Sequence, residues 1–595
     1  MKTFSKTLCC LLSLVLLSGA VYTSGIYSFA AQPEFEILEI DDSNPFDYEH
    51  FVNEPEKEKS RGGIEISPSE ETNTKAADLP SSYDSRDYGY VSPVKNQGAT
   101  GTCWAHATMS ALESYELIYN RENAENINLS ESHLTWFSLN PNSNGANKAL
   151  DGENLGTGAY SNGGNWRYAA LALANREGLN KESDYPLMIS GSNMTYSESD
   201  RYSQTAGITA EDAVYLSNTD KDGIKSAIMN NGSVTCSICY NNLYLTSIYS
   251  SGSRKASYYC PDTSQTNHAV TLVGWDDNYS KSNFISKVPS GNGAWIAKNS
   301  YGSSWGNNGY FMISYEDASI SQFVSWSAMD TSEFTNNYSH TSALFKTTIT
   351  GFNTYASVYT AEGNEMIDNI GIFNLMPDAS VTVSVYRNLP ADGNPVSGNL
   401  AGSQKRYLTN DGYYTFYFGN IPLNKGERFA VVVTSACSGD KLIPVESESI
   451  GSFTCNAGES YIKTGNSWFD LTDNTEYAFG NTYVFVNTKC RHSYDSRETP
   501  ATCITSGKSE TYCQYCNLIV SESVIPATGH HFNTVSSSES DSNKIVYTEV
   551  CEHCGVIQTE SYIKGSRTIT FAQLIQQIFE MFFGRLRGVK AGDKY

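Results

Sequence analysis

A cysteine and a glutamine near residue 100 have the types and the spacing needed for chemistry on an acyl group. Cys103 follows a glycine-rich turn and opens a run of apolar residues at helical spacing, which predicts a helix that begins at the thiol. The positive end of such a helix favours a thiolate, the reactive form of cysteine. Gln97 lies six residues upstream. Its amide would join the Cys103 backbone N–H as a second donor to an oxyanion.

A base with an orienting partner lies further along the chain. His268 stands at the start of an apolar run, up to Trp275, that predicts a buried strand. A second such run starts at Ala294 and ends at Asn299. An imidazole can take the proton of a thiol, and a side-chain amide can hold that imidazole in one tautomer. The chain therefore contains the members of a Cys–His–Asn constellation.

The order of these four positions resembles the papain family of cysteine peptidases. Segments 79–86, 129–134, 162–164 and 304–310 resemble landmarks of that family and occur in the same order. The resemblance implies a two-lobed α+β peptidase domain that needs no cofactor for catalysis. It implies catalytic roles for Gln97 at the oxyanion, Cys103 as nucleophile, His268 as base and acid and Asn299 as orienting amide, and substrate-binding roles for Gly163, Gly164 and Trp305.

Three positions depart from the family pattern. Thr100 stands where the family has a disulfide cysteine. Tyr301 replaces a tryptophan, and we expect it to shield the His–Asn bond as an aromatic ring. His106 replaces a phenylalanine one helical turn beyond Cys103. It is a poorer candidate than His268 for the base, because it projects from the same helix as the thiol.

The N-terminal residues and the net charge predict an exported, acidic protein. Residues 1–31 have two lysines, then an apolar run from Leu8 to Ala20 and small residues beyond it, as in a signal peptide. The run is too short to span a membrane, so we expect no transmembrane segment after signal removal. The predicted localisation is secreted or cell-surface associated. The net charge of −24 argues against nucleic-acid binding.

The segment before the peptidase motifs has a different composition. Residues 32–77 are acidic and lack hydrophobic periodicity, which predicts a disordered linker. A short pro-segment that lies over the cleft is the alternative. The peptidase domain is expected over residues 78–328, with protein or peptide substrates as its partners.

An all-β domain is expected next, over residues 329–488. Short alternating runs recur there between Gly, Asn and Asp turns, which predicts a β-sandwich. The segment resembles the lectin-like domain behind papain-like peptidases in modular secreted proteins of Gram-positive bacteria. The resemblance implies a cell-surface or glycan ligand for this domain, although fold analogy alone does not specify a sugar.

Residues 489–562 form a small Cys/His-rich module. Cys513 and Cys516 make one Cys-x-x-Cys pair, and Cys551 and Cys554 make a second pair 38 residues further on. Paired thiolates with nearby histidines suit tetrahedral zinc, so these four cysteines are candidate ligands of structural zinc. Disulfides are the alternative, because an exported chain meets an oxidising environment.

The last segment, residues 563–595, has apolar residues at helical spacing and ends with basic residues. This pattern predicts an amphipathic helix. Such a helix would dock on a partner, lie on an acidic envelope or pack against the preceding module.

Two functions of different classes fit these observations. One is a secreted cysteine endopeptidase with accessory binding modules. The other is a cell-surface adhesin or carbohydrate-binding protein that retains a peptidase-like scaffold. The intact catalytic set favours the peptidase, because decayed copies usually lose one of its members.

Overall fold

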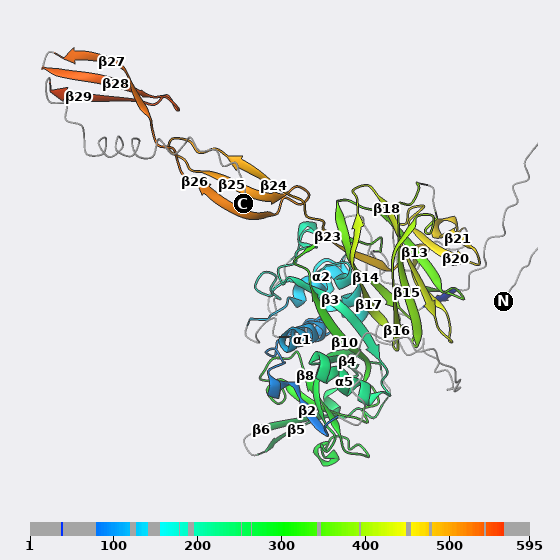
Figure 1. Cartoon of the computed structure of the whole chain (residues 1–595). Coiled ribbons are helices and arrows are strands. Elements are labelled where there is room, and N and C mark those ends of the chain that lie inside the picture. The colour runs from blue at the N-terminus through cyan, green and yellow to red at the C-terminus, as the bar shows by residue number, and fades with distance from the viewer. Residues whose placement is uncertain are drawn as a thin grey trace, which may run out of the picture.

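The structure is a computed structural model of the whole chain (Figure 1). It describes residues 37–39, 79–119, 126–140, 155–177, 179–187, 195–250, 253–262, 265–341, 347–391, 394–447, 454–474, 479–540 and 543–563. The predicted signal peptide and the predicted C-terminal amphipathic helix lie outside these residues, as does most of the segment 32–77.

Helices gather in the first lobe of the N-terminal half. They are α1 (Cys103–Ile118), α2 (Glu131–Leu139), α3 (Ala159–Asn162) and α4 (Trp166–Ala174). The side chain of Ser130 caps α2 and that of Asn165 caps α4, each accepting a hydrogen bond from a backbone N–H of the first turn. The predicted helix at the thiol is confirmed, and all of it from Cys103 to Leu117 is buried.

Strands dominate the second lobe. They pack with α5 (Lys221–Asn231) around an aromatic core that includes Trp275, Trp295 and Phe311. The run at His268 forms β7 and pairs antiparallel with β8, which carries Asn299 immediately after its end. The strands of this lobe are β2 (Ser82–Asp84), β3 (Ile208–Leu216), β4 (Val234–Ile238), β5 (Leu245–Ser250), β6 (Ser253–Tyr258), β7 (His268–Asp276), β8 (Ala294–Lys298), β9 (Tyr310–Ser314) and β10 (Ser321–Asp330).

The following region is all β, as predicted. One sheet has the order β16-β15-β18-β13-β20-β21, and another has the order β1-β12-β19-β22. Its strand β1 (Ile37–Glu39) comes from the segment that we expected to be a linker. The remaining strands of the region are β11 (Phe334–Tyr338), β12 (Thr347–Thr350), β13 (Thr354–Thr360), β14 (Glu365–Asn374), β15 (Ala379–Arg387), β16 (Asn399–Leu408), β17 (Gly412–Leu423), β18 (Arg428–Ala436), β19 (Leu442–Ser447), β20 (Ser460–Thr464), β21 (Ser467–Asp470), β22 (Phe479–Thr482) and β23 (Val484–Cys490).

The two halves are joined through a shared sheet. Strand β17 pairs antiparallel with β3, so the order β11-β23-β14-β17-β3-β10 runs from one half into the other. A side chain at Gly412 would place its Cβ 2.4 Å from the Ala213 carbonyl oxygen, so this close pairing requires glycine. The Asp212 carboxylate accepts a hydrogen bond from the Thr415 backbone N–H at 2.7 Å. The peptidase lobes and the β region therefore form one packed body.

Beyond β23 the chain leaves this body as an arm of two small sheets in line (Figure 1). The first sheet contains β24 (Tyr494–Thr499), β25 (Gly507–Cys513) and β26 (Ile519–Ile525). The second contains β27 (Phe532–Ser540), β28 (Lys544–Cys551) and β29 (Ile557–Ile563). The predicted fold class, a two-lobed α+β domain with an all-β region and a Cys/His-rich module, is confirmed.

Within the described residues, none of the helices is long and apolar enough to cross a membrane.

Candidate active site

The thiol of Cys103 lies at the first residue of α1, as predicted. The side chain of the N-cap residue Thr102 makes no capping hydrogen bond to the first turn of the helix. The backbone of Ala269, the residue after His268, lies close enough to the sulfur to lower the pKa of the thiol. Burial nevertheless raises the pKa of the Cys103 thiol, and the nearby backbone groups offset this only in part. The expected resting thiolate is therefore disfavoured, because desolvation outweighs the helix end.

The imidazole of His268 is held by Asn299, as the motif implied. His268 Nε2 and Asn299 Oδ1 are 2.8 Å apart, and both residues are buried. The Tyr301 ring stacks on the imidazole with centroids 4.9 Å apart, which confirms the predicted aromatic shield. Burial lowers the pKa of His268 to about 4, against the opposing effect of the Asn299 hydrogen bond. The resting imidazole is therefore neutral at pH 7, and its Nδ1 is left for the thiol proton.

The amide of Gln97 is fixed in one orientation by two neighbours. Its Nε2 donates to the Thr100 carbonyl oxygen at 2.6 Å, and its Oε1 accepts from the Ser300 hydroxyl at 2.5 Å. The second Nε2 hydrogen remains for an oxyanion. Ser300 also ties this amide to the base, because its backbone N–H donates to Asn299 Oδ1 at 2.8 Å.

The Gly163–Gly164 pair packs directly against the loop and helix that carry the thiol. A Cβ at Gly164 would lie 2.5 Å from the indole of Trp104, the neighbour of Cys103. Gly163 adopts φ 77° and ψ −176°, a conformation that L side chains rarely adopt. The Gly101 backbone N–H donates to the Tyr160 carbonyl oxygen at 2.7 Å. The sequence pair thus forms a bare backbone edge beside the nucleophile.

Trp305 packs against the Tyr301 ring that covers the imidazole. Its ring meets the Tyr301 ring edge-on with centroids 5.7 Å apart and packs against Phe311 at 5.2 Å. Tyr240, which the sequence motifs did not single out, completes this aromatic wall with its ring 5.5 Å from His268. The wall excludes water from the His–Asn bond on that side.

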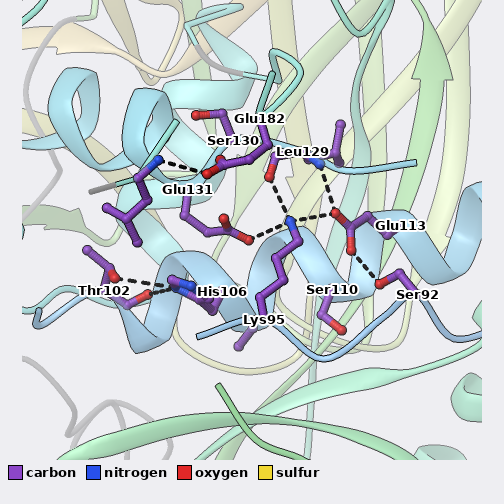
Figure 2. A network of polar contacts seen from close by, with 12 residues as sticks. Ser92, Lys95, Thr102, His106, Ser110, Glu113, Leu129, Ser130, Glu131 and Glu182 are labelled. Carbon is purple, nitrogen blue, oxygen red and sulfur yellow. Dashed lines mark hydrogen bonds and ion pairs between the residues drawn. The ribbon is translucent and has the colours of Figure 1, made fainter. Parts of the chain in front are cut away.

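A network of ion pairs and hydrogen bonds centred on Lys95 joins α1 to α2 (Figure 2). Lys95 Nζ lies 2.8 Å from Glu113 Oε1 on α1 and 2.8 Å from Glu131 Oε1 on α2, and it donates to the Leu129 carbonyl oxygen at 2.7 Å. Lys95 precedes Gln97 by two residues, so the network ties the loop that carries Gln97 to α1, the helix that begins at Cys103. The sequence does not predict this network, because isolated Lys and Glu residues are typical of exposed surfaces.

His106 lies beside this network, at the start of α1 (Figure 2). Its Nδ1 lies 2.9 Å from the Thr102 carbonyl oxygen, within its own helix (Figure 2). Together with Glu113, Lys298 and Asn299 it lines a cavity of about 20 Å³. This volume is far below the roughly 300 Å³ of a small-molecule site. The contact with Thr102 therefore holds the His106 ring at the start of the helix.

The four candidate zinc ligands do not form one site. Cys513 and Cys516 cluster with Cys490 and His492, whereas Cys551 and Cys554 cluster with Cys503 and His530. The twelve cysteines among the described residues are all free of disulfide bonds. Each Cys-x-x-Cys pair thus has its own histidine and a third cysteine, a set whose chemistry suits a metal ion.

Comparisons with known proteins match the two halves separately. Residues 79–328 match the model of the papain family cysteine proteases, and residues 337–484 match that of the lectin-like domain. The thiol protease aleurain of Arabidopsis thaliana is 30% identical over 241 residues, which are 40% of this chain and 57% of that protein. The chain thus spans less than two thirds of the length of such relatives.

A solved structure covers both halves together. It contains the cysteine protease and lectin-like domains of Cwp84, a surface-layer-associated protein of Clostridium difficile. It is 27% identical, with a TM-score of 0.57, over 69% of this chain and 89% of that one. A second structure of clostridial Cwp84, after propeptide cleavage, is 26% identical with a TM-score of 0.58 and covers 69% of this chain and 99% of that one. Residues 79–328 therefore belong to the papain family of cysteine proteases, and residues 337–484 form a lectin-like domain.

Proposed function

We propose that this protein is a cysteine endopeptidase that hydrolyses peptide bonds through an acyl-enzyme. The observation that carries the proposal is the His268–Asn299 pair at 2.8 Å, directly followed by the Ala269 backbone that contacts the Cys103 sulfur. This arrangement places a neutral base, already oriented, beside a nucleophile at a helix start. A protein that acts only as an adhesin does not need an oriented base beside a thiol.

In the proposed reaction, His268 Nδ1 takes the proton of the Cys103 thiol as the sulfur attacks the substrate carbonyl carbon. The carbonyl oxygen becomes an oxyanion that accepts hydrogen bonds from the Cys103 backbone N–H and Gln97 Nε2. The imidazolium then gives its proton to the leaving amine, and an acyl-thioester forms. In the second half-reaction His268 takes a proton from water as the water oxygen attacks the thioester carbon. The C–S bond then breaks, the carboxylic acid leaves, and the imidazolium returns its proton to the sulfur.

Asn299 keeps the imidazole in the productive orientation through both half-reactions. A buried imidazolium must form during each of them, and Asn299 Oδ1 is positioned to stabilise it. Because burial raises the pKa of the thiol and lowers the pKa of the base, proton transfer is uphill in the free site. Bound substrate then supplies the electrophile that makes the transfer productive.

The Gly163–Gly164 edge is proposed to receive an extended peptide. Its backbone groups would form hydrogen bonds with the substrate backbone, as between two strands, and these bonds do not depend on the side chains of the substrate. Trp305 bounds the same region on the imidazole side. Substrate choice would then depend on side-chain pockets beside this edge.

The proposed organisation follows the sequence boundaries. It comprises a signal peptide over 1–31, a linker or short pro-segment over 32–77, the peptidase over 78–328, the lectin-like domain over 329–488 and the Cys/His module over 489–562. Export to the cell surface is supported by the N-terminal pattern and by the likeness to a surface-layer-associated protein. A glycan or another cell-surface molecule is the proposed ligand of the lectin-like domain.

Covalent labelling tests this proposal directly. A peptidyl epoxide should modify one residue per chain, and peptide mapping should place the label on Cys103. Labelling should vanish in Cys103→Ala and persist in Cys437→Ser, a matched control in the lectin-like domain. A labelled Cys103 with no hydrolysis of any peptide in a diverse library would favour the adhesin instead.

A further inference from the structure

The arm contains two clusters with the same donors. The first consists of Cys490, His492, Cys513 and Cys516, and the second of Cys503, His530, Cys551 and Cys554. In each cluster the four ligand atoms lie within 4.8 Å of one another. Three thiols and one imidazole, without any carboxylate, are the donors that zinc prefers and that Ca²⁺ or Mg²⁺ does not.

The distances within each cluster are those of a tetrahedral zinc site. Cys490 Sγ and Cys513 Sγ are 3.7 Å apart, and so are Cys503 Sγ and Cys551 Sγ. Zn–S bonds of about 2.3 Å at tetrahedral angles require S···S edges of about 3.8 Å, whereas a disulfide requires about 2.05 Å.

The sulfur–nitrogen edges agree as well. Cys516 Sγ lies 3.5 Å from His492 Nδ1, and Cys554 Sγ lies 3.3 Å from His530 Nδ1. A tetrahedral site with a Zn–N bond of about 2.0–2.1 Å requires about 3.5 Å. Both clusters are therefore preformed for one zinc ion each.

Each cluster takes three ligands from one small sheet and one from the unit before it. Cys490 is the last residue of β23, a strand of the shared sheet, whereas its three partners lie at the first arm sheet: His492 precedes β24, Cys513 ends β25 and Cys516 follows it. Cys503 lies in the loop between β24 and β25, whereas its three partners belong to the second arm sheet. Each site thus spans a junction between consecutive units of the chain.

The arm sheets lack another source of stability. From residue 491 to 563, the buried apolar residues among those described are Cys503, Cys513 and Cys551. Large apolar side chains there, such as Val524, Val535 and Ile557, are exposed. A unit this small without an apolar core needs a metal or covalent cross-links to fold.

We propose that the arm binds two structural zinc ions, and that each ion clamps a three-stranded sheet to the unit that precedes it. Each ion then fixes the angle at one junction. Together the two ions hold the arm extended from the packed body of the peptidase lobes and the β region, as it lies in Figure 1. The inference is independent of the proposed peptidase activity, because the clusters share no residue with the active site.

Metal analysis of the purified full chain tests the sites, in a Cys103→Ala background that prevents self-digestion. Two zinc ions per chain are expected. The double variant Cys513→Ser/Cys516→Ser and the double variant Cys551→Ser/Cys554→Ser should each retain one ion. Cys437→Ser, outside both clusters, should retain two. A chain without metal whose arm cysteines are all oxidised would overturn the proposal.

Trypsin tests the clamp. Arg491 lies between the ligands Cys490 and His492, so a zinc ion bound there should protect the bond after Arg491 from cleavage. A strong chelator should accelerate this cut at least about tenfold, and Cys490→Ser should do so without chelator while the second site keeps its ion. If zinc is bound but its removal changes neither this cut nor the maximum dimension in X-ray scattering, the ions do not clamp the junctions. The Cys103 parent should hydrolyse small peptides equally well in either case.

Discussion

Replacing Lys95 with methionine tests whether the buried network positions the active site. At 2.8 Å and an effective dielectric constant of about 20, each contact of Nζ with a carboxylate is worth about 6 kcal/mol before desolvation. Removing one partner of a buried ion pair costs about 3–5 kcal/mol, since the remaining charges lose their compensation. The Lys95 side chain keeps 20% exposure, so we expect the lower limit, about 3 kcal/mol.

Urea unfolding followed by tryptophan fluorescence measures this loss. All but one of the eight tryptophans lie between Trp104 and Trp326, so the signal reports mainly on the peptidase lobes. With an m value of about 3 kcal/mol/M, Lys95→Met should lower the urea midpoint by about 1 M. Lys463→Met, on the exposed face of β20, should leave it nearly unchanged. If the two variants unfold at the same midpoint, the network does not stabilise the site as argued.

Three further perturbations follow from the site. Ser300→Ala removes the hydroxyl that holds the Gln97 amide and should lower kcat with little change in KM. The loss should be smaller than the roughly 100-fold expected when an oxyanion donor is removed entirely. An unchanged kcat would contradict the assigned contact. Gly164→Ala forces a methyl group against Trp104 and should lower kcat/KM by up to about 100-fold, whereas Gly158→Ala, with open space at its Cβ, should not. Since burial holds the pKa of His268 at about 4, kcat/KM should persist well below pH 6.5 and fall as the pH drops through about 4; loss of kcat/KM already near pH 6.5 would contradict this neutral base. The unfolded chain binds that proton from about pH 6.5 downward, so the unfolding free energy should also fall between about pH 6.5 and 4.

The residues proposed to be catalytic could be named from the sequence because the proposed chemistry dictates their types. A helix that begins at Cys103 and a strand that begins at His268 follow from local periodicity. The order of the motifs along the chain indicates that both belong to one site. Gln97 and Asn299 followed from the same motifs.

The resting charge of Cys103 was not predictable in this way. It depends on how deeply the finished fold buries the sulfur, which a local helix pattern does not report. Likewise, Lys95 and Ser300 act through contacts with residues far away in the sequence. Nothing in their immediate neighbours distinguishes them from surface residues.

Long-range pairing also escaped prediction. The pairing of β17 with β3 joins two segments whose sequence patterns each predict a complete domain, and it brings together residues about 200 positions apart in the chain. The two Cys-x-x-Cys pairs were evident, but their division into separate clusters was not. The remaining ligands, Cys490 and Cys503, come from the preceding units of the chain.

Steady-state hydrolysis of a peptide library by the parent chain and by Cys103→Ala tests the central claim most directly. The account predicts that the parent cleaves peptide bonds and that Cys103→Ala, with unchanged circular dichroism, does not, while Cys437→Ser cleaves like the parent. Equal turnover by the parent and by Cys103→Ala would contradict it.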